Sequence, residues 1–177
     1  MKNKFLLDLA RRAIESELER EKLATGEIPE EFKAKKACFV TLTIEGRLRG
    51  CIGNLEPKDE LWKSVASNAI SAAFGDPRFW PLRKEELEKV EIEISILDSP
   101  KVLKSKSLKD LLDYLRKNKP GVIVEKKGYS AKFLPQVWEE LRSPEEFLSQ
   151  LCLKAGLEED EWQRGVGIKT YSVKSVS

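Results

Sequence analysis

Apolar positions along the chain follow two periodicities, and together they predict both helices and strands. Spacing of three and four residues predicts amphipathic helices, with caps or glycine stops near their ends, over residues 5–23, 61–74, 107–118 and 143–156. Alternation and β-branched runs predict strands over residues 38–44, 47–53, 90–96, 122–124, 129–133 and 166–173. The turn at Glu45-Gly46 and the one at Lys126-Lys127-Gly128 each join two strands into a hairpin.

This order of elements predicts an α+β fold with a mainly antiparallel sheet flanked by helices. A length of 177 residues suits a single domain over residues 1–177. Boundaries between lobes are expected near residues 29–36 and 98–107. In the last helix, four apolar residues are expected to form one buried stripe: Phe147, Leu148, Leu151 and Cys152.

The composition limits the chemistry that is open to the chain. It has no histidine, so catalytic arrangements that need one, and histidine-rich metal sites, are excluded. We expect Cys38, Cys51 and Cys152 to be unpaired in a reducing compartment, because they are few, odd in number and far apart. The N-terminus lacks the pattern of a signal peptide, and the longest uncharged run has 12 residues, over 64–75. A cytoplasmic protein without a membrane span is therefore expected.

Charged residues are abundant and unevenly distributed. The chain has 23 Glu and 22 Lys against 3 Gln and 4 Asn, a balance typical of thermophile proteins. Residues 101–132 hold 10 basic and 3 acidic side chains, a surplus that can bind nucleic acid. Their lysines are interleaved with few aromatics, so we favour a solvated lysine surface over a nucleic-acid site. No phosphate-loop, dinucleotide or calcium motif occurs, and we expect neither a metal nor a cofactor.

The run Leu48-Arg49-Gly50-Cys51-Ile52-Gly53 is the strongest candidate for a functional segment. Glycine permits positive φ and close approach of another backbone, so the two glycines could present the Cys51 thiol at a bend. Arg49 and the N-terminus of the next helix would both favour a thiolate, which makes Cys51 a candidate nucleophile. The alternative is that the glycines mark a bulge and Cys51 is a small buried hydrophobe.

Asp76-Pro77-Arg78-Phe79 is a second candidate segment. Its arginine could bind a carboxylate or phosphate, or it could simply pair with Asp76 and hold the loop. We expect Arg49, Cys51, Asp76 and Arg78 to converge on one concave surface that suits a small anionic or carbonyl-bearing molecule. This requires the loop over residues 76–81 to fold back along the helix, with Phe79 and Trp80 docking onto the apolar face of that helix.

Several segments together resemble the AMMECR family, the Alport syndrome, mental retardation, midface hypoplasia and elliptocytosis candidate-region family. Its prokaryotic members are often called AmmeMemoRadiSam system protein A. The segments are Leu48-Arg49-Gly50-Cys51-Ile52-Gly53, Ala72-Ala73-Phe74, Asp76-Pro77-Arg78-Phe79, Glu91-Ile92-Glu93-Ile94-Ser95, Phe133-Leu134-Pro135-Gln136-Val137, Glu146-Phe147-Leu148 and Leu151-Cys152-Leu153-Lys154-Ala155-Gly156-Leu157. Their order and spacing match from about Cys38 to the C-terminus.

The resemblance implies two unequal lobes around an antiparallel sheet, with residues 48–53 as the supposed functional site. It supplies no reaction. It does imply a pathway shared with a Memo-type dioxygenase-like protein and a radical-SAM protein. This chain departs from the family pattern at Trp80, where relatives usually carry proline.

Three functions stay open. The leading one is a protein that works with partner enzymes and has a small-ligand or partner site around residues 48–53. The first alternative is an enzyme that uses Cys51 as its nucleophile. The second is a nucleic-acid-binding regulator that uses the basic segment over residues 101–132.

Overall fold

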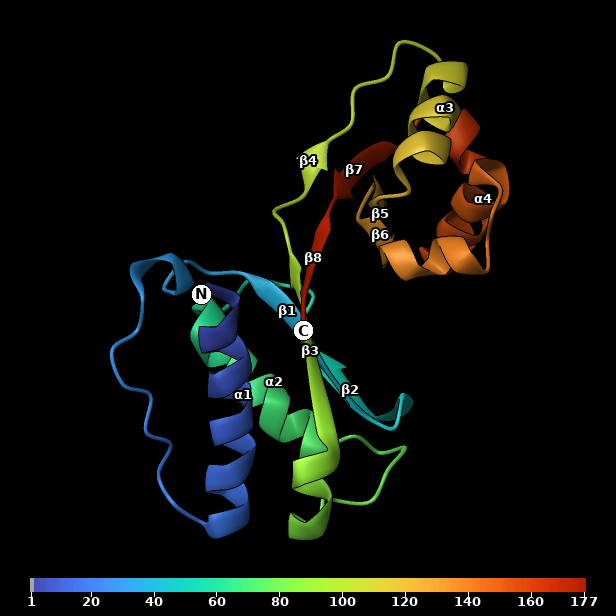
Figure 1. Ribbon diagram of the computed structural model, residues 1–177. Helices are drawn as coiled ribbons and strands as arrows, with labels where there is room; N and C mark the ends of the chain where they lie inside the picture. Colours follow the sequence, from blue (N-terminus) through green and yellow to red (C-terminus); the bar gives the residue numbers. More distant parts are fainter. Residues whose placement is uncertain (1) are drawn as a thin grey trace. The chain divides into compact units, whose positions relative to one another are not determined.

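Two four-stranded sheets, each with its own helices, make up the α+β fold of the computed structural model, which describes residues 2–177 (Figure 1). The strands expected to form one mainly antiparallel sheet are thus shared between two. The chain divides into a first unit, which runs to Leu97 and includes Lys174–Ser177, and a second unit, Asp98–Val173. The segment over residues 29–36 lies inside the first unit.

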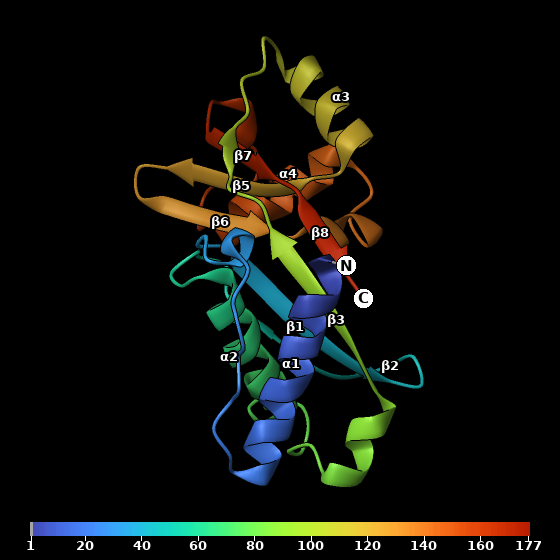
Figure 2. The same cartoon turned by 60° about the vertical axis from the view of Figure 1, so that its left-hand side comes forward.

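The sheet of the first unit has the order β2-β1-β3-β8. Its strands are β1 (Ala37–Ile44), β2 (Arg47–Gly53), β3 (Val90–Leu97) and β8 (Val173–Val176). Helices α1 (Lys2–Glu19) and α2 (Leu61–Phe74) lie side by side against one face of this sheet (Figures 1 and 2). Two short 3-10 helices, η1 (Glu30–Phe32) and η2 (Lys84–Lys89), lie in its connections.

Strand alternation explains which side of this sheet is buried. On β1, Val40 and Leu42 point into the core that α1 and α2 cover, whereas Thr41 and Thr43 on the other face are only half-buried. The hairpin between β1 and β2 turns at Glu45 and Gly46, which both have positive φ as a two-residue turn of this kind requires.

The second unit contains the sheet β4-β7-β5-β6 and the helices α3 (Leu108–Asn118) and α4 (Pro144–Lys154). Its strands are β4 (Lys101–Val102), β5 (Gly121–Lys126), β6 (Tyr129–Phe133) and β7 (Gly167–Tyr171), and its 3-10 helices are η3 (Pro135–Glu139) and η4 (Glu161–Gln163). Phe147 of α4 lies at the centre of the core, where it stacks on Trp138 with ring centroids 3.8 Å apart. The expected stripe on α4 is confirmed, because all four of its residues are buried.

Two predicted elements have different ends in the structure. The first helix, predicted to reach residue 23, ends at Glu19 because Arg20 adopts a left-handed conformation. The chain beyond it then runs back beside the helix, where Arg12 Nη1 donates to the Ala24 carbonyl at 2.9 Å. The last strand, predicted over residues 166–173, ends at Tyr171 as β7, and after Ser172 the chain enters β8, which belongs to the other sheet.

The expectation that the three cysteines are unpaired is confirmed. Burial raises the pKa of Cys38 to about 11, and burial also raises the pKa of Cys152. Over residues 2–177, none of the helices combines the length and the apolar character needed to cross a lipid bilayer.

Substitutions in α4 should separate core burial from helix capping. Leu151→Ala should lower the free energy of unfolding by about 2–5 kcal/mol, because it removes buried methyl groups and leaves a cavity. Ser143→Ala should lower it by about 1 kcal/mol, since only the cap of the Glu146 amide is lost. Urea unfolding measures both, with the half-exposed Leu153→Ala as a control expected to change it by about 0.5 kcal/mol or less. Equal effects of Leu151→Ala and Leu153→Ala would contradict the burial assignment.

Candidate functional site

The two glycines of the 48–53 run make room for neighbouring elements, as predicted. A Cβ atom on Gly50 would lie 2.1 Å from the carbonyl oxygen of Ala72, so α2 packs directly on the backbone of β2 at this position. A Cβ on Gly53 would lie 2.3 Å from the ring of Phe39 on β1. Neither glycine has positive φ, and both belong to strand β2. The expected bend at Cys51 is therefore absent, and close approach alone explains the need for glycine.

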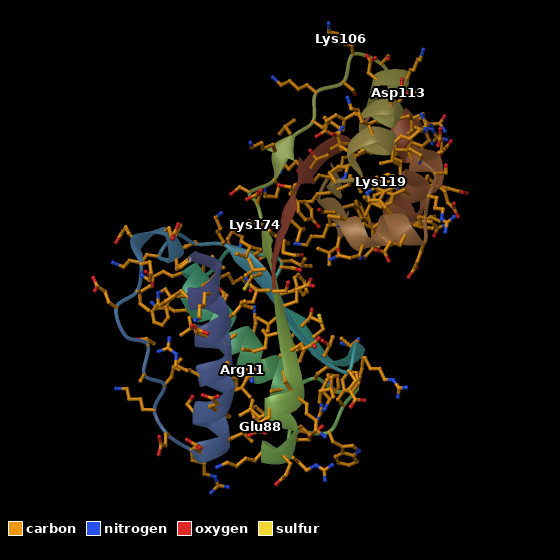
Figure 3. All side chains as sticks on the ribbon, in the orientation of Figure 1. Arg11, Glu88, Lys106, Asp113, Lys119 and Lys174 are labelled. Atoms are coloured by element: carbon orange, nitrogen blue, oxygen red, sulfur yellow. The ribbon has the colours of Figure 1, made fainter. Side chains whose placement is uncertain are left out.

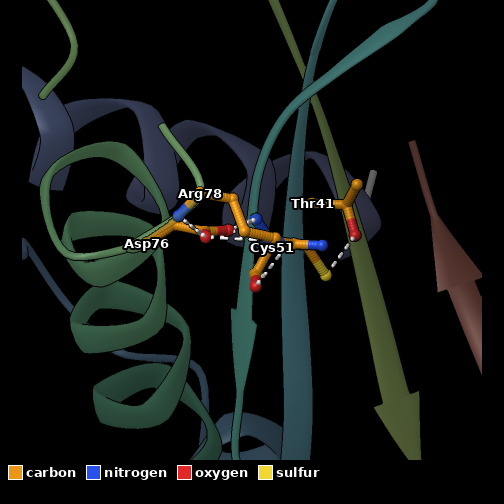
Figure 4. Close-up of polar contacts among 4 residues, drawn as sticks. All are labelled: Thr41, Cys51, Asp76 and Arg78. Carbon is orange, nitrogen blue, oxygen red and sulfur yellow. Dashed lines mark hydrogen bonds and ion pairs between the residues drawn. The ribbon is translucent and has the colours of Figure 1, made fainter. Parts of the chain in front are cut away.

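Cys51 points to the face of the sheet opposite the one that Gly50 presents to α2. It pairs with Thr41 on β1, and the Thr41 hydroxyl donates to the Cys51 Sγ at 3.3 Å (Figure 4). Cys51 is half-buried, whereas Cys38 and Cys152 are fully buried. It is thus the most accessible of the three thiols.

The loop after α2 closes the outer edge of β2 with two side chains. Asp76 Oδ2 accepts the Cys51 N–H at 2.9 Å, and Arg78 Nη2 donates to the Cys51 carbonyl at 3.4 Å (Figure 4). The two side chains therefore satisfy both backbone groups of Cys51 that point away from β1, as a neighbouring strand would do. Asp76 and Arg78 meet Cys51 without a long return of the loop, because Gly50 lies beside Ala72, near the C-terminal end of α2.

Asp76 and Arg78 are also bound to each other. Arg78 donates to the carboxylate through Nη2 at 2.7 Å, Nε at 3.0 Å and its backbone N–H at 3.1 Å. Only 2% of the Asp76 side chain is exposed, whereas 54% of the Arg78 side chain is. The Arg78 guanidinium, together with the Cys51 and Arg78 amides, holds the pKa of Asp76 well below its usual range.

Arg49 leaves the regular ladder of β2 and forms a second ion pair. The β1–β2 register shifts between Leu42 and Thr43, so Arg49 is the extra residue of a β-bulge. Its side chain binds Glu86 of η2 in a bidentate manner, with distances of 2.9 and 3.1 Å. Hydrogen bonds from Arg49 are the main cause that lowers the pKa of Glu86 to about 2. Among the described residues, Arg49 Nη1 is a buried nitrogen without a hydrogen-bond partner.

A cavity of about 630 Å³ opens beside these pairs. It is lined by Arg49, Arg78, Phe79, Trp80, Pro81, Arg83 and Glu86. Two of the expected site residues, Arg49 and Arg78, therefore share one cavity, while Cys51 and Asp76 lie outside its lining. Trp80 does not dock onto α2 as expected, because its side chain is 88% exposed. Leu82 provides the anchor instead: it is buried, and its N–H donates to the Ala73 carbonyl at 2.8 Å.

The remaining residues of the 48–53 run contribute to the strand. Leu48 is exposed, and Ile52 packs against the core of the first unit. Sequence reasoning did not find Arg83 and Glu86. Glu86 lies 37 residues from Arg49 in a short acidic helix, and no local pattern connects the two before the bulge and η2 bring them together.

The arrangement defines a polar pocket that is built on the edge of an antiparallel sheet. A comparison with protein families identifies the class: the AMMECR1 family model matches residues 7–176. The chain belongs to the AMMECR1 family, as the resemblance of its motifs implied.

Relatives from thermophilic archaea are similar over most of the chain. Protein MJ0810 of Methanocaldococcus jannaschii is 40% identical over 94% of this chain and 84% of its own length. Protein NEQ441 of Nanoarchaeum equitans is 41% identical over 89% of each chain. The crystal structure of the uncharacterized protein PH0010 from Pyrococcus horikoshii is 35% identical, covers 98% of this chain and 89% of its own, and has a TM-score of 0.75.

Replacing Asp76 should test how far the β2 edge depends on its charge. Asp76→Asn should lower the free energy of unfolding by about 1.5–3 kcal/mol at pH 7, because hydrogen bonds to a charged acceptor are lost. The pKa of Asp76 is lowered in the folded state, so its contribution is complete above the unfolded value of about 3.9 and declines as the pH falls below it. Urea unfolding at pH 7, 4 and 2.5 should show that the difference in free energy of unfolding between wild type and variant becomes smaller as the pH is lowered.

Asp113→Asn is the matched control for this experiment. Asp113 also pairs with an arginine, Arg116, at 3.0 Å, but both side chains are more than half exposed. Its substitution should change the free energy of unfolding by about 0.5 kcal/mol or less. Equal effects of the two substitutions, or an Asp76→Asn effect that is independent of pH, would contradict the role assigned to Asp76.

Proposed function

We propose that the protein binds a small anionic molecule in the cavity beside β2. The observation that carries the proposal is that Arg49 and Arg83 share one carboxylate. Glu86 is 2.9 Å from Arg49 Nε and 3.9 Å from Arg83 Nε, and its oxygen also accepts the Arg83 N–H at 2.9 Å. Arg78 lies on the same wall, and Asp76 balances its charge at 2.7 Å. The guanidinium groups of Arg49 and Arg83 therefore have one carboxylate between them. This surplus of positive charge favours an anion.

Guanidinium groups select carboxylate and phosphate because both present two oxygens at matching spacing. The bonds of Arg78 to Asp76 and Cys51 use its Nε and Nη2, which leaves the Nη1 protons for another acceptor. The unpartnered Nη1 of Arg49 is a second donor that an incoming oxygen would satisfy. The volume of about 630 Å³ lies within the usual range of small-molecule sites, about 300–1,000 Å³.

Titration with inorganic pyrophosphate tests the proposal. The Nε–H resonances of Arg49 and Arg78 in ¹H–¹⁵N spectra should shift saturably as pyrophosphate is added. Arg83→Gln should weaken binding about tenfold or more, since a hydrogen bond between charged partners contributes about 1.5–3 kcal/mol. Arg47→Gln is the control, because Arg47 is an exposed arginine of β2, the strand of Arg49, and lies outside the cavity lining.

Equal losses from Arg83→Gln and Arg47→Gln would indicate general charge attraction and contradict a site in this cavity. The absence of any saturable shift up to about 10 mM pyrophosphate would contradict the site as well, because it would limit the binding free energy to less than about 3 kcal/mol.

A nucleophilic role for Cys51 is the second candidate, and its accessibility favours it, because Cys51 is half-buried whereas Cys38 and Cys152 are buried. The Thr41 hydroxyl donates to the Cys51 Sγ at 3.3 Å and fixes the direction of the sulfur. Iodoacetamide at pH 7 should then modify the folded protein once, at Cys51, within minutes. Cys38 and Cys152 should react only after unfolding, because both are buried. Mass spectrometry of the digested protein measures the sites. If Cys51 reacts no faster than cysteine in a short peptide, an activated nucleophile is contradicted. Cys51→Ser should still bind pyrophosphate in either case, because Cys51 lies outside the cavity lining.

The proposed binding protein acts in the cytoplasm beside Memo-type and radical-SAM proteins. Support for these partners comes from the family resemblance, and the three free cysteines suit a reducing compartment. Nucleic-acid binding by the basic segment is less well supported. Lysines such as Lys106 do project outward (Figure 3), but Lys126 pairs with Glu161 and Arg116 with Asp113 and Glu145 of the same unit.

A further inference from the structure

The anion-binding proposal leaves one wall of the cavity unexplained, the indole of Trp80. Trp138 and Trp162 are buried, with exposures of 3% and 6%, whereas 88% of Trp80 is exposed. Trp80 lines the cavity that Arg49 and Arg83 also line, so a large apolar ring and charged groups face the same space. An exposed ring at this position offers a flat surface that the core does not use.

The segment that carries Trp80 is fixed at both ends. On one side, the Phe79 N–H donates to the Asp76 carbonyl at 3.1 Å, and the Arg78 guanidinium lies 5.5 Å from the centroid of the Phe79 ring. On the other side, Pro81 restricts the backbone and Leu82 is buried and bonded to Ala73. The backbone at Trp80 is thus ordered before any ligand arrives, which reduces the entropy lost on binding.

We infer that the ligand of this cavity is a planar aromatic ring that carries a phosphate or carboxylate group, with a nucleoside monophosphate as the model compound. The inference rests on the proposed anion site. The ring would stack on the Trp80 indole, and the anionic group would bind the guanidinium groups of Arg49 and Arg83. An aromatic ring and a guanidinium pair recognise different parts of one molecule, so together they select against anions without a ring.

Three probes separate the two contributions: adenosine monophosphate, ribose 5-phosphate, which lacks the ring, and adenosine, which lacks the phosphate. Stacking of a base on an aromatic side chain should make adenosine monophosphate bind about 5- to 150-fold more tightly than ribose 5-phosphate. Binding should also quench the tryptophan fluorescence that is excited at 295 nm. The part of the quenching that comes from Trp80 is identified by its loss in Trp80→Phe. Calorimetry gives the affinities.

Trp80→Ala should bring the affinity for adenosine monophosphate down to that for ribose 5-phosphate and leave pyrophosphate binding unchanged within about twofold. Trp80→Phe should retain part of the preference, because phenylalanine keeps an aromatic face. Trp62→Phe is the matched control, since Trp62 is half-buried on α2 and lies outside the cavity lining, and it should change neither the affinities nor the quenching.

The outcomes distinguish this inference from the proposal on which it rests. If wild-type protein binds adenosine monophosphate and ribose 5-phosphate equally, the aromatic part is overturned while anion binding stands. If Trp80→Ala keeps the preference, stacking on Trp80 is overturned in the same way. If adenosine monophosphate, ribose 5-phosphate and pyrophosphate all fail to bind, the anion site and the aromatic inference are both overturned. Contact with a partner protein then remains as the explanation of the exposed Trp80.

Discussion

The carboxylate of Asp76 is the contact on which the arrangement around β2 depends. It is buried and accepts four hydrogen bonds, one from the Cys51 amide and three from Arg78. A buried charge is tolerated only when its bonds are satisfied, so this carboxylate fixes both the strand edge and the loop at once. The same loop supplies Arg78, Phe79, Trp80 and Pro81 to the cavity wall. The structure of the pocket therefore follows from an interaction that lies just behind it.

The electrostatics of the pocket follow from how its ion pairs are shared. Arg78 has a carboxylate of its own in Asp76, whereas Arg49 and Arg83 share Glu86. The carboxylate of the first pair is saturated by its hydrogen bonds and holds the loop, while the bonds of Arg78 leave its Nη1 protons for another acceptor. The second group has an excess of donors. The β-bulge in β2 places Arg49 of this group outside the regular ladder. The first pair thus mainly holds the structure, and the excess of donors lies in the second group.

The residues of the 48–53 run, which the sequence predicts to be one functional segment, have several different roles in the structure. Gly50 and Gly53 provide space for Ala72 and Phe39, and Ile52 belongs to the core. Cys51 faces Thr41 on the opposite side of the strand from Gly50. Arg49 is the member of the run that lines the cavity. Much of what looked like a site in the sequence is therefore a packing requirement, and the proposed site extends to residues far from the run.

The sequence by itself determined the local elements, because their signals lie within a few residues of one another. The bounds of α2 and α3, the Glu45-Gly46 turn and the buried stripe of α4 all followed from periodicity, caps and turn chemistry. Only the tertiary structure decided that the strands form two sheets, that Trp80 is exposed, and that Glu86 and Arg83 meet Arg49. The physical reason is that an ion pair between residues 37 apart leaves no periodic trace in the sequence, because strand order and a single bulge create it.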